Sequence, residues 1–117
     1  MKLSNKYLNI FKKECKKWID ILKLDNWEVY YDWQDKEGTF ASIYTDLSGY
    51  VATIFLTRDW EDLFDHIEEQ IKRTAKHEVI HLLLSRLSDN ARSRFIAEAD
   101  LGESEEELVR KLEKIIK

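Results

Sequence analysis

The segment His77-Glu78-Val79-Ile80-His81 stands inside a long apolar-periodic run from about residue 60 to 87. The spacing of this run is that of a helix. Residues four apart on a helix lie one turn above each other, so His77 and His81 can present two imidazole nitrogens to a single zinc ion. Glu78 lies one step round the helix, within reach of a water at such an ion. Three leucines follow directly. The pattern therefore predicts that the histidine pair belongs to a core helix.

These residues follow the His-Glu-x-x-His pattern of zinc metalloproteases, in which the glutamate is the general base and the metal polarises the carbonyl. The pattern specifies two histidines, a glutamate and their helical setting together. Two of the chain's three histidines belong to it. The plain alternative is a helix that carries two histidines and a glutamate without a metal.

Composition limits the remaining classes. With 117 residues and 44% hydrophobic content, the chain is expected to form a single domain over residues 1–117. The net charge of -4 argues against a broad surface for nucleic acid or anionic membrane, so no nucleic-acid partner is expected. The single cysteine, Cys15, fits a reducing compartment and a core position on the first helix. With no apolar signal region and no membrane span, we expect a cytoplasmic protein.

The periodicity predicts an α+β fold with helices packed on one face of a three-stranded antiparallel sheet. Short loops between consecutive strands favour pairing of sequence neighbours. Asp59 is expected to cap the long helix and Ser104 the last one. The expected elements are a helix to about residue 23, strands over 27–33, 39–45 and 50–57, a long helix over about 60–87 with a break allowed near residue 65, a short helix over 91–99, a turn at 101–103 and a last helix over 105–116.

A catalytic zinc site usually takes three protein ligands and leaves one position for water, so the two histidines need a partner. His66 is the remaining histidine, and on an unbroken helix it would lie about 16 Å from His77, too far to share the metal. No histidine follows His81. A carboxylate from a later element is therefore the natural candidate.

The last helix supplies that carboxylate. The mean direction of its apolar residues passes within about 20° of Glu105. An acid at the centre of an apolar face is costly unless it is paired or binds a metal. Glu105 is therefore the first choice for the third ligand, Glu106 the second and Glu98 the third. The alternative for Glu105 is a first-turn glutamate stabilised by the helix dipole.

With His77, Glu78, His81 and a downstream glutamate, the chain resembles the gluzincin class of zinc metallopeptidases. More narrowly, it is similar to the minigluzincins and to small metallopeptidases of phages and prophages. HEVIH is the specific part, and the closing segment EEELVRKLEKI is suggestive. The resemblance implies a minimal zincin-like catalytic domain with zinc on His77, His81 and a glutamate of the last helix, and with Glu78 as base. It also implies that the strand 50–57 lies over the cleft and pairs with an extended peptide.

One departure concerns support of the histidines. Larger gluzincins carry an aspartate four residues after the ligand glutamate, whereas Val109 follows Glu105 at that spacing. Support must then come from elsewhere, such as Asp100 or a backbone carbonyl. Candidates for stabilising the oxyanion of the reaction are Tyr44, Tyr50 and Arg92, with packing as the alternative role for the tyrosines.

The leading hypothesis is zinc-dependent hydrolysis of peptide bonds, with Glu78 accepting a proton from water. The second is a zinc-stabilised interaction protein without turnover, such as a phage factor that binds a host protein. Glu78 separates them, because a structural zinc site fills all four positions and needs no base. A third hypothesis is a protease acting on DNA-bound proteins, as in SprT-like enzymes, against which the acidic balance counts.

Overall fold

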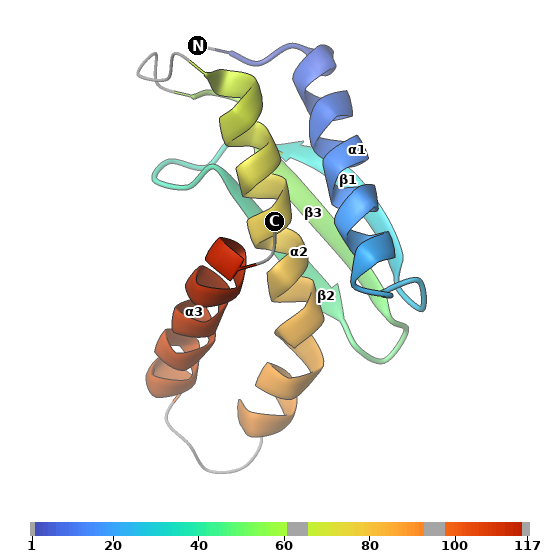
Figure 1. Ribbon diagram of the computed structural model, residues 1–117, viewed down its shortest axis with the longest axis vertical. Coiled ribbons are helices and arrows are strands. Elements are labelled where there is room, and N and C mark those ends of the chain that lie inside the picture. The colour runs from blue at the N-terminus through green and yellow to red at the C-terminus, as the bar shows by residue number, and fades with distance from the viewer. Residues whose placement is uncertain (1, 61–65, 93–97, 116–117) are drawn as a thin grey trace.

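Within residues 2–60, 66–92 and 98–115, which this computed structural model describes, the chain forms one helix, three strands and two further helices (Figure 1). The α+β class predicted from the sequence is confirmed. The elements are α1 (Asn5–Ile21), β1 (Glu28–Gln34), β2 (Ala41–Asp46), β3 (Val51–Thr57), α2 (Ile67–Arg92) and α3 (Glu98–Ile115). None of the helices in these ranges is both long and apolar enough to cross a membrane.

The sheet is mixed, with the strand order β1-β3-β2. β3 pairs parallel with β1 and antiparallel with β2. The predicted antiparallel meander is therefore wrong. The physical reason for the different strand order is the burial of β3, in which Ala52, Ile54 and Leu56 are fully buried. A strand that is buried to this extent is favoured in the middle of a sheet. Strands adjacent in sequence, β1 and β2, consequently flank β3 instead of pairing with each other.

The connection between β1 and β2 passes the end of β3. There the backbone N–H of Thr57 donates to the carbonyl of Phe40, and that of Arg58 donates to the carbonyl of Gln34, both at 2.9 Å. The ends of the β1–β2 connection thus bind the end of β3, and β1 and β2 do not form the hairpin that their short connection suggested. β3, which covers most of the strand 50–57 expected to pair with a peptide, has both edges hydrogen-bonded within the sheet, whereas β2 is an edge strand.

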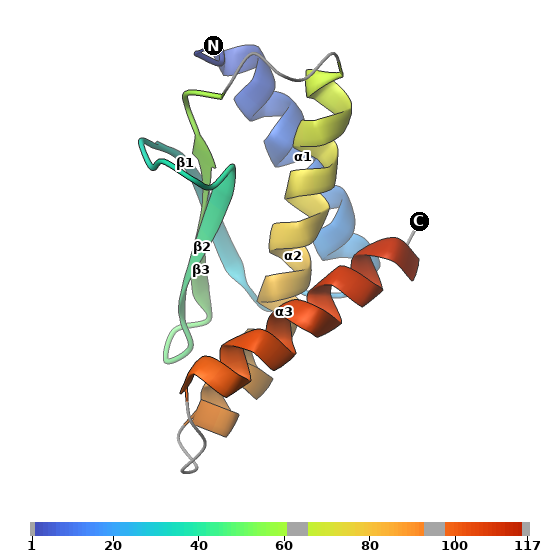
Figure 2. The same cartoon turned by 90° about the vertical axis from the view of Figure 1, so that its left-hand side faces the viewer.

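Helices α1 and α2 cover one face of the sheet (Figure 2). α1 contributes Phe11, Cys15 and Trp18 to the core, which confirms the predicted core position of Cys15. The predicted apolar stripe of the long helix is also buried, at Ile71, Ala75, Val79 and Leu82. α3 packs against α2 and crosses it at an angle (Figures 1 and 2). The histidine pair is thus carried by the helix that lies between the sheet and α3.

The helix boundaries differ from the predicted ones. α2 begins at Ile67, and Asp59 forms a β-bridge with Lys2. Trp60 is buried, stacks on Phe40 at 4.4 Å and donates its indole N–H to the carbonyl of Thr57. Trp60 itself, expected at the start of the long helix, is thus placed by tertiary packing before α2 begins. Residues 61–65 lie outside the described part of the chain.

At the other end, α2 continues past its predicted end at about residue 87 to Arg92. α3 begins at Glu98, so Gly102 and Ser104 lie inside it and form neither a turn nor a cap. A glycine inside a helix costs about 1 kcal/mol relative to alanine, which packing of α3 on α2 can offset. The predicted short helix over 91–99 falls largely on residues 93–97, which lie outside the described residues.

Candidate metal centre

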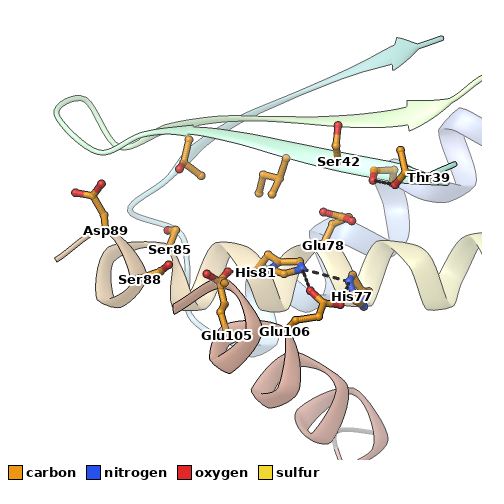
Figure 3. Close-up of a pocket in the computed structure, with 14 residues that line it drawn as sticks. Thr39, Ser42, His77, Glu78, His81, Ser85, Ser88, Asp89, Glu105 and Glu106 are labelled. Atoms are coloured by element: carbon orange, nitrogen blue, oxygen red, sulfur yellow. Dashed lines mark hydrogen bonds and ion pairs between the residues drawn. The ribbon is translucent and has the colours of Figure 1, made fainter. Parts of the chain in front are cut away.

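His77 and His81 lie one turn apart on α2, as the sequence predicts, and their rings point toward α3 (Figure 3). Their Nε2 atoms are 3.2 Å apart. The ring centroids are separated by 4.9 Å and the ring planes by 70°. This arrangement directs both Nε2 atoms toward the same point beside the helix.

Glu106 of α3 brings a carboxylate to that point (Figure 3). Its Oε1 lies 3.5 Å from Nε2 of His77, and its Oε2 lies 3.2 Å from Nε2 of His81. The ligand atoms of His77, His81 and Glu106 all lie within 4.8 Å of one another. Donors around a tetrahedral ion with bonds of about 2.0–2.1 Å are about 3.3 Å apart. The three side chains therefore fit a small metal ion with nitrogen and oxygen ligands.

Glu105, the first choice from the sequence, lies behind one of the rings. Its Oε1 is 2.9 Å from Nδ1 of His81, on the side of the imidazole opposite Nε2. The side chain of Glu105 is 15% exposed and that of Glu106 is 33% exposed. The centre of the apolar face of α3, where Glu105 lies, therefore packs against α2. The point that both Nε2 atoms face lies at the more exposed edge of this helix contact. The second choice, Glu106, is the carboxylate that the structure places there.

His66, the third histidine of the chain, does not join this group. His66 precedes the start of α2, and it is exposed. Among the described residues, the group of mutually close ligand atoms contains His77, His81 and Glu106. The side chain of Glu98 lies outside the part of the chain that the structure describes.

Both histidines have a carboxylate at the second ring nitrogen. Oε2 of Glu113 lies 2.5 Å from Nδ1 of His77, while Glu105 takes the corresponding place at His81. An imidazole whose Nδ1–H donates to a carboxylate keeps its Nε2 lone pair free for a metal. Both rings are thereby oriented for coordination through Nε2.

Glu113 was not identified from the sequence, although a signal was present. It follows Glu106 by seven residues, and seven residues return a helix to nearly the same face. Asp100, proposed from the sequence as a support for a histidine, has a side chain outside the described residues.

Glu78 is 6% exposed, and its carboxylate points into the space between α2 and the sheet (Figure 3). Burial raises the pKa of this carboxyl above its ordinary value. The nearby His81 and His77 act in the opposite direction, and the negative charges of Glu106 and Glu113 add to the rise. A carboxylate is thus held beside the candidate ligands without being one of them.

Two cavities meet at this centre. The larger, of about 550 Å³, lies between β2, α2 and α3 and extends toward Ser88 and Asp89. The smaller, of about 190 Å³, extends along α2 in the other direction toward Gln70 and Arg73. The residues that line both are Thr39, Ala41, His77 and Glu78. The candidate metal centre therefore lies at the junction of the two cavities.

The tyrosines considered for the oxyanion lie elsewhere. Tyr44 is 68% exposed, and Tyr50 packs edge-on against Trp27 at 5.1 Å. Neither tyrosine lines either of the two cavities. The side chain of Arg92 lies outside the described residues.

The chain matches no protein-family model, no curated protein and no solved structure. What indicates the chemistry of this protein is therefore the arrangement of His77, Glu78, His81 and the carboxylates of α3.

Proposed function

We propose that the protein is a zinc-dependent metallopeptidase of the minigluzincin type, in which His77, His81 and Glu106 hold zinc and Glu78 is the general base. The observation that carries this proposal is a pair of Nε2 atoms 3.2 Å apart with the two oxygens of Glu106 facing them, Oε2 3.2 Å from His81 and Oε1 3.5 Å from His77, beside the buried Glu78. Two imidazoles and one carboxylate are a donor set that zinc adopts in catalytic sites.

A three-ligand centre suits catalysis better than a purely structural role. Structural zinc sites close all four positions with protein atoms, whereas catalytic sites leave one position open. The candidate group has three members among the described residues, and it borders the larger cavity through His77, His81 and Glu106. This openness favours turnover over the alternative, a zinc-stabilised interaction protein.

Zinc in such a site polarises a peptide carbonyl and makes a neighbouring water more acidic. Glu78 accepts the proton of the attacking water and delivers it to the leaving amine, the role that its position in the cleft supports. Glu78 lines both cavities. A substrate chain that runs from one cavity into the other would therefore pass Glu78 at the bond that is cut.

The edge strand β2 offers a binding mode for the substrate. Ala41, Ser42 and Ile43 of β2 line the larger cavity. An extended peptide that adds to a sheet edge forms main-chain hydrogen bonds with it, and its alternate side chains enter neighbouring pockets. We infer that the substrate is an extended or unfolded segment whose flanking residues occupy the two cavities.

The test compares wild-type protein with Glu78→Gln, both loaded with zinc, on quenched fluorescent peptides and on an unfolded protein. We expect cleavage by the wild type, no cleavage by Glu78→Gln and equal zinc content in the two proteins. If both proteins bind zinc and neither cleaves any peptide, the interaction-protein hypothesis replaces this one. Salt-dependent binding of single-stranded DNA would instead favour the third hypothesis.

A further inference from the structure

Among the described side chains, the three carboxylates that contact the imidazoles all come from one helix, α3. Glu106 faces both Nε2 atoms, while Glu105 and Glu113 lie against Nδ1 of His81 and His77. Building on the proposed metal centre, we propose that Glu105 and Glu113 are positioning residues for the two histidines, and that zinc binding is therefore coupled to docking of α3 on α2.

The carboxylates share the face of α3 that packs on α2. At about 100° per residue, Glu105, Glu106 and Glu113 all lie within about 60° of Val109. Val109 is fully buried, so its direction marks the face in contact with the rest of the protein. Glu103 lies about 120° from Val109 and is exposed. α3 can therefore dock on α2 only in a rotation that also delivers the three carboxylates to the histidines.

Each positioning contact fixes a ring in two respects. A carboxylate at Nδ1 selects the tautomer that carries the proton there, and it also stops rotation of the imidazole. Without Glu113, the ring of His77 would lose the partner at 2.5 Å that turns its Nε2 toward Glu106. Glu105 does the same for His81 at 2.9 Å. The two histidines are thus prepared for metal by residues of another helix.

The docked position of α3 combines apolar and charged contacts: Val109 is fully buried, while Glu105, Glu106 and Glu113 meet the two histidines. Three carboxylates gathered on one face also repel one another in the absence of a cation. A metal that binds the docked form and not the undocked form shifts this equilibrium by a factor of about 1 + [metal]/Kd. Zinc would therefore hold α3 in place.

Docking of α3 also shapes the substrate site. Gly102, Glu105 and Glu106 form the α3 side of the larger cavity. When α3 leaves α2, that wall is lost together with one ligand and both positioning carboxylates. Free zinc thus controls the cleft itself as well as the chemistry inside it.

The positioning roles are tested by zinc affinity, measured by competition with a chromophoric chelator. We expect Glu105→Gln and Glu113→Gln to weaken zinc binding about 10- to 100-fold, the usual effect of removing such outer partners. Glu113→Gln keeps an acceptor oxygen and should fall between the wild type and Glu113→Ala. Glu103→Gln removes the same charge from the same helix and should bind zinc like the wild type. Equal affinity in all these variants would overturn the positioning roles.

The coupling is tested on the wild-type protein by hydrogen exchange with mass spectrometry, with zinc and with chelator. At free zinc of one hundred times Kd, amides of α3 should exchange up to about 100-fold more slowly. Amides of α1 serve as the internal reference and should change little. The coupling is overturned if zinc binds and α3 is unaffected, or if α1 slows equally. A zinc-protected α3 in a protein without peptidase activity would remove only the proposed activity.

Discussion

Oε2 of Glu113 lies 2.5 Å from Nδ1 of His77, although 36 residues separate the two along the chain. The contact joins the last turns of α3 to the first histidine of the HEVIH segment. Together with Glu105 at His81, it means that neither imidazole is oriented by α2 alone. The two histidines of α2 and the carboxylates of α3 therefore form one structural unit.

The two adjacent glutamates of α3 should behave differently when each is replaced by alanine. Glu106→Ala removes a ligand, so the protein should retain little zinc after dialysis against a weak chelator. Glu105→Ala should retain about one zinc per chain under mild conditions and lose it to a stronger competitor. Elemental mass spectrometry of both variants beside the wild type measures this. The reverse pattern would restore Glu105 as the third ligand.

Replacement of the proposed base should affect turnover without affecting the metal. Glu78→Gln keeps the size of the side chain and removes its ability to accept a proton. We expect kcat to fall about 100- to 10,000-fold, the usual contribution of a general base. Zinc content and the circular dichroism spectrum should match those of the wild type. A variant that keeps most of its activity would exclude Glu78 as the base.

Stability should fall at alkaline pH because of the buried thiol. Burial is the main cause that raises the pKa of Cys15 well above its ordinary value, and the charges of Glu78 and Glu14 add to it. In the unfolded chain this thiol ionises near pH 8.5. The folded state then holds the extra proton, so its contribution to stability is complete below about pH 8.5 and is lost as the pH rises toward the folded-state pKa. The slope from this group is at most about 1.4 kcal/mol per pH unit.

Urea unfolding between pH 7 and 10 tests that slope. Cys15→Ala should be less stable at pH 7, because it leaves a cavity, and its stability should fall less steeply above about pH 8.5. Tyr31→Phe is the comparison: burial raises the pKa of Tyr31 as well, so its removal should flatten the curve only above about pH 10. Parallel curves for wild type and Cys15→Ala would contradict this account.

The core stripe of α2 should be sensitive to truncation. Ile71 is fully buried, and Ile71→Ala should cost about 2–5 kcal/mol of the free energy of unfolding. Leu87, on the same helix, is 64% exposed, and Leu87→Ala should change stability by less than about 0.5 kcal/mol. Urea titration of both variants gives the comparison. Similar losses in the two variants would mean that α2 packs differently from the structure.

Local periodicity was enough to predict several features. Four-residue spacing placed His77 and His81 on one face of a helix, and alternation located the three strands to within two residues at their starts and ends. The strand order was not accessible in the same way. The order depends on which strand is hydrogen-bonded to a neighbour on both edges. The short loop between β1 and β2 suggested that these two strands pair with each other, whereas both pair with β3.

The candidate third ligand shows a different limit. The apolar face of α3 was a sound guide to the residues that meet α2, and Glu105 does lie there. The point that both Nε2 atoms face lies at the flank of that contact, so the neighbouring residue, Glu106, is the candidate ligand there. To predict this choice one must know how α3 crosses α2. The periodicity of the α3 sequence alone carries no information about that crossing.

The central place of β3 also has a consequence for the order of folding. β2 and β3 are joined by a short turn, so pairing them closes a small loop. Pairing β1 with β3 closes a longer loop, because β2 and both connections lie between them in the sequence. Loop-closure entropy grows with the length of the loop. We therefore expect the β2–β3 hairpin to form early and β1 to join later as its parallel neighbour. The strand that borders the cleft would then be among the first parts of the chain to reach native pairing.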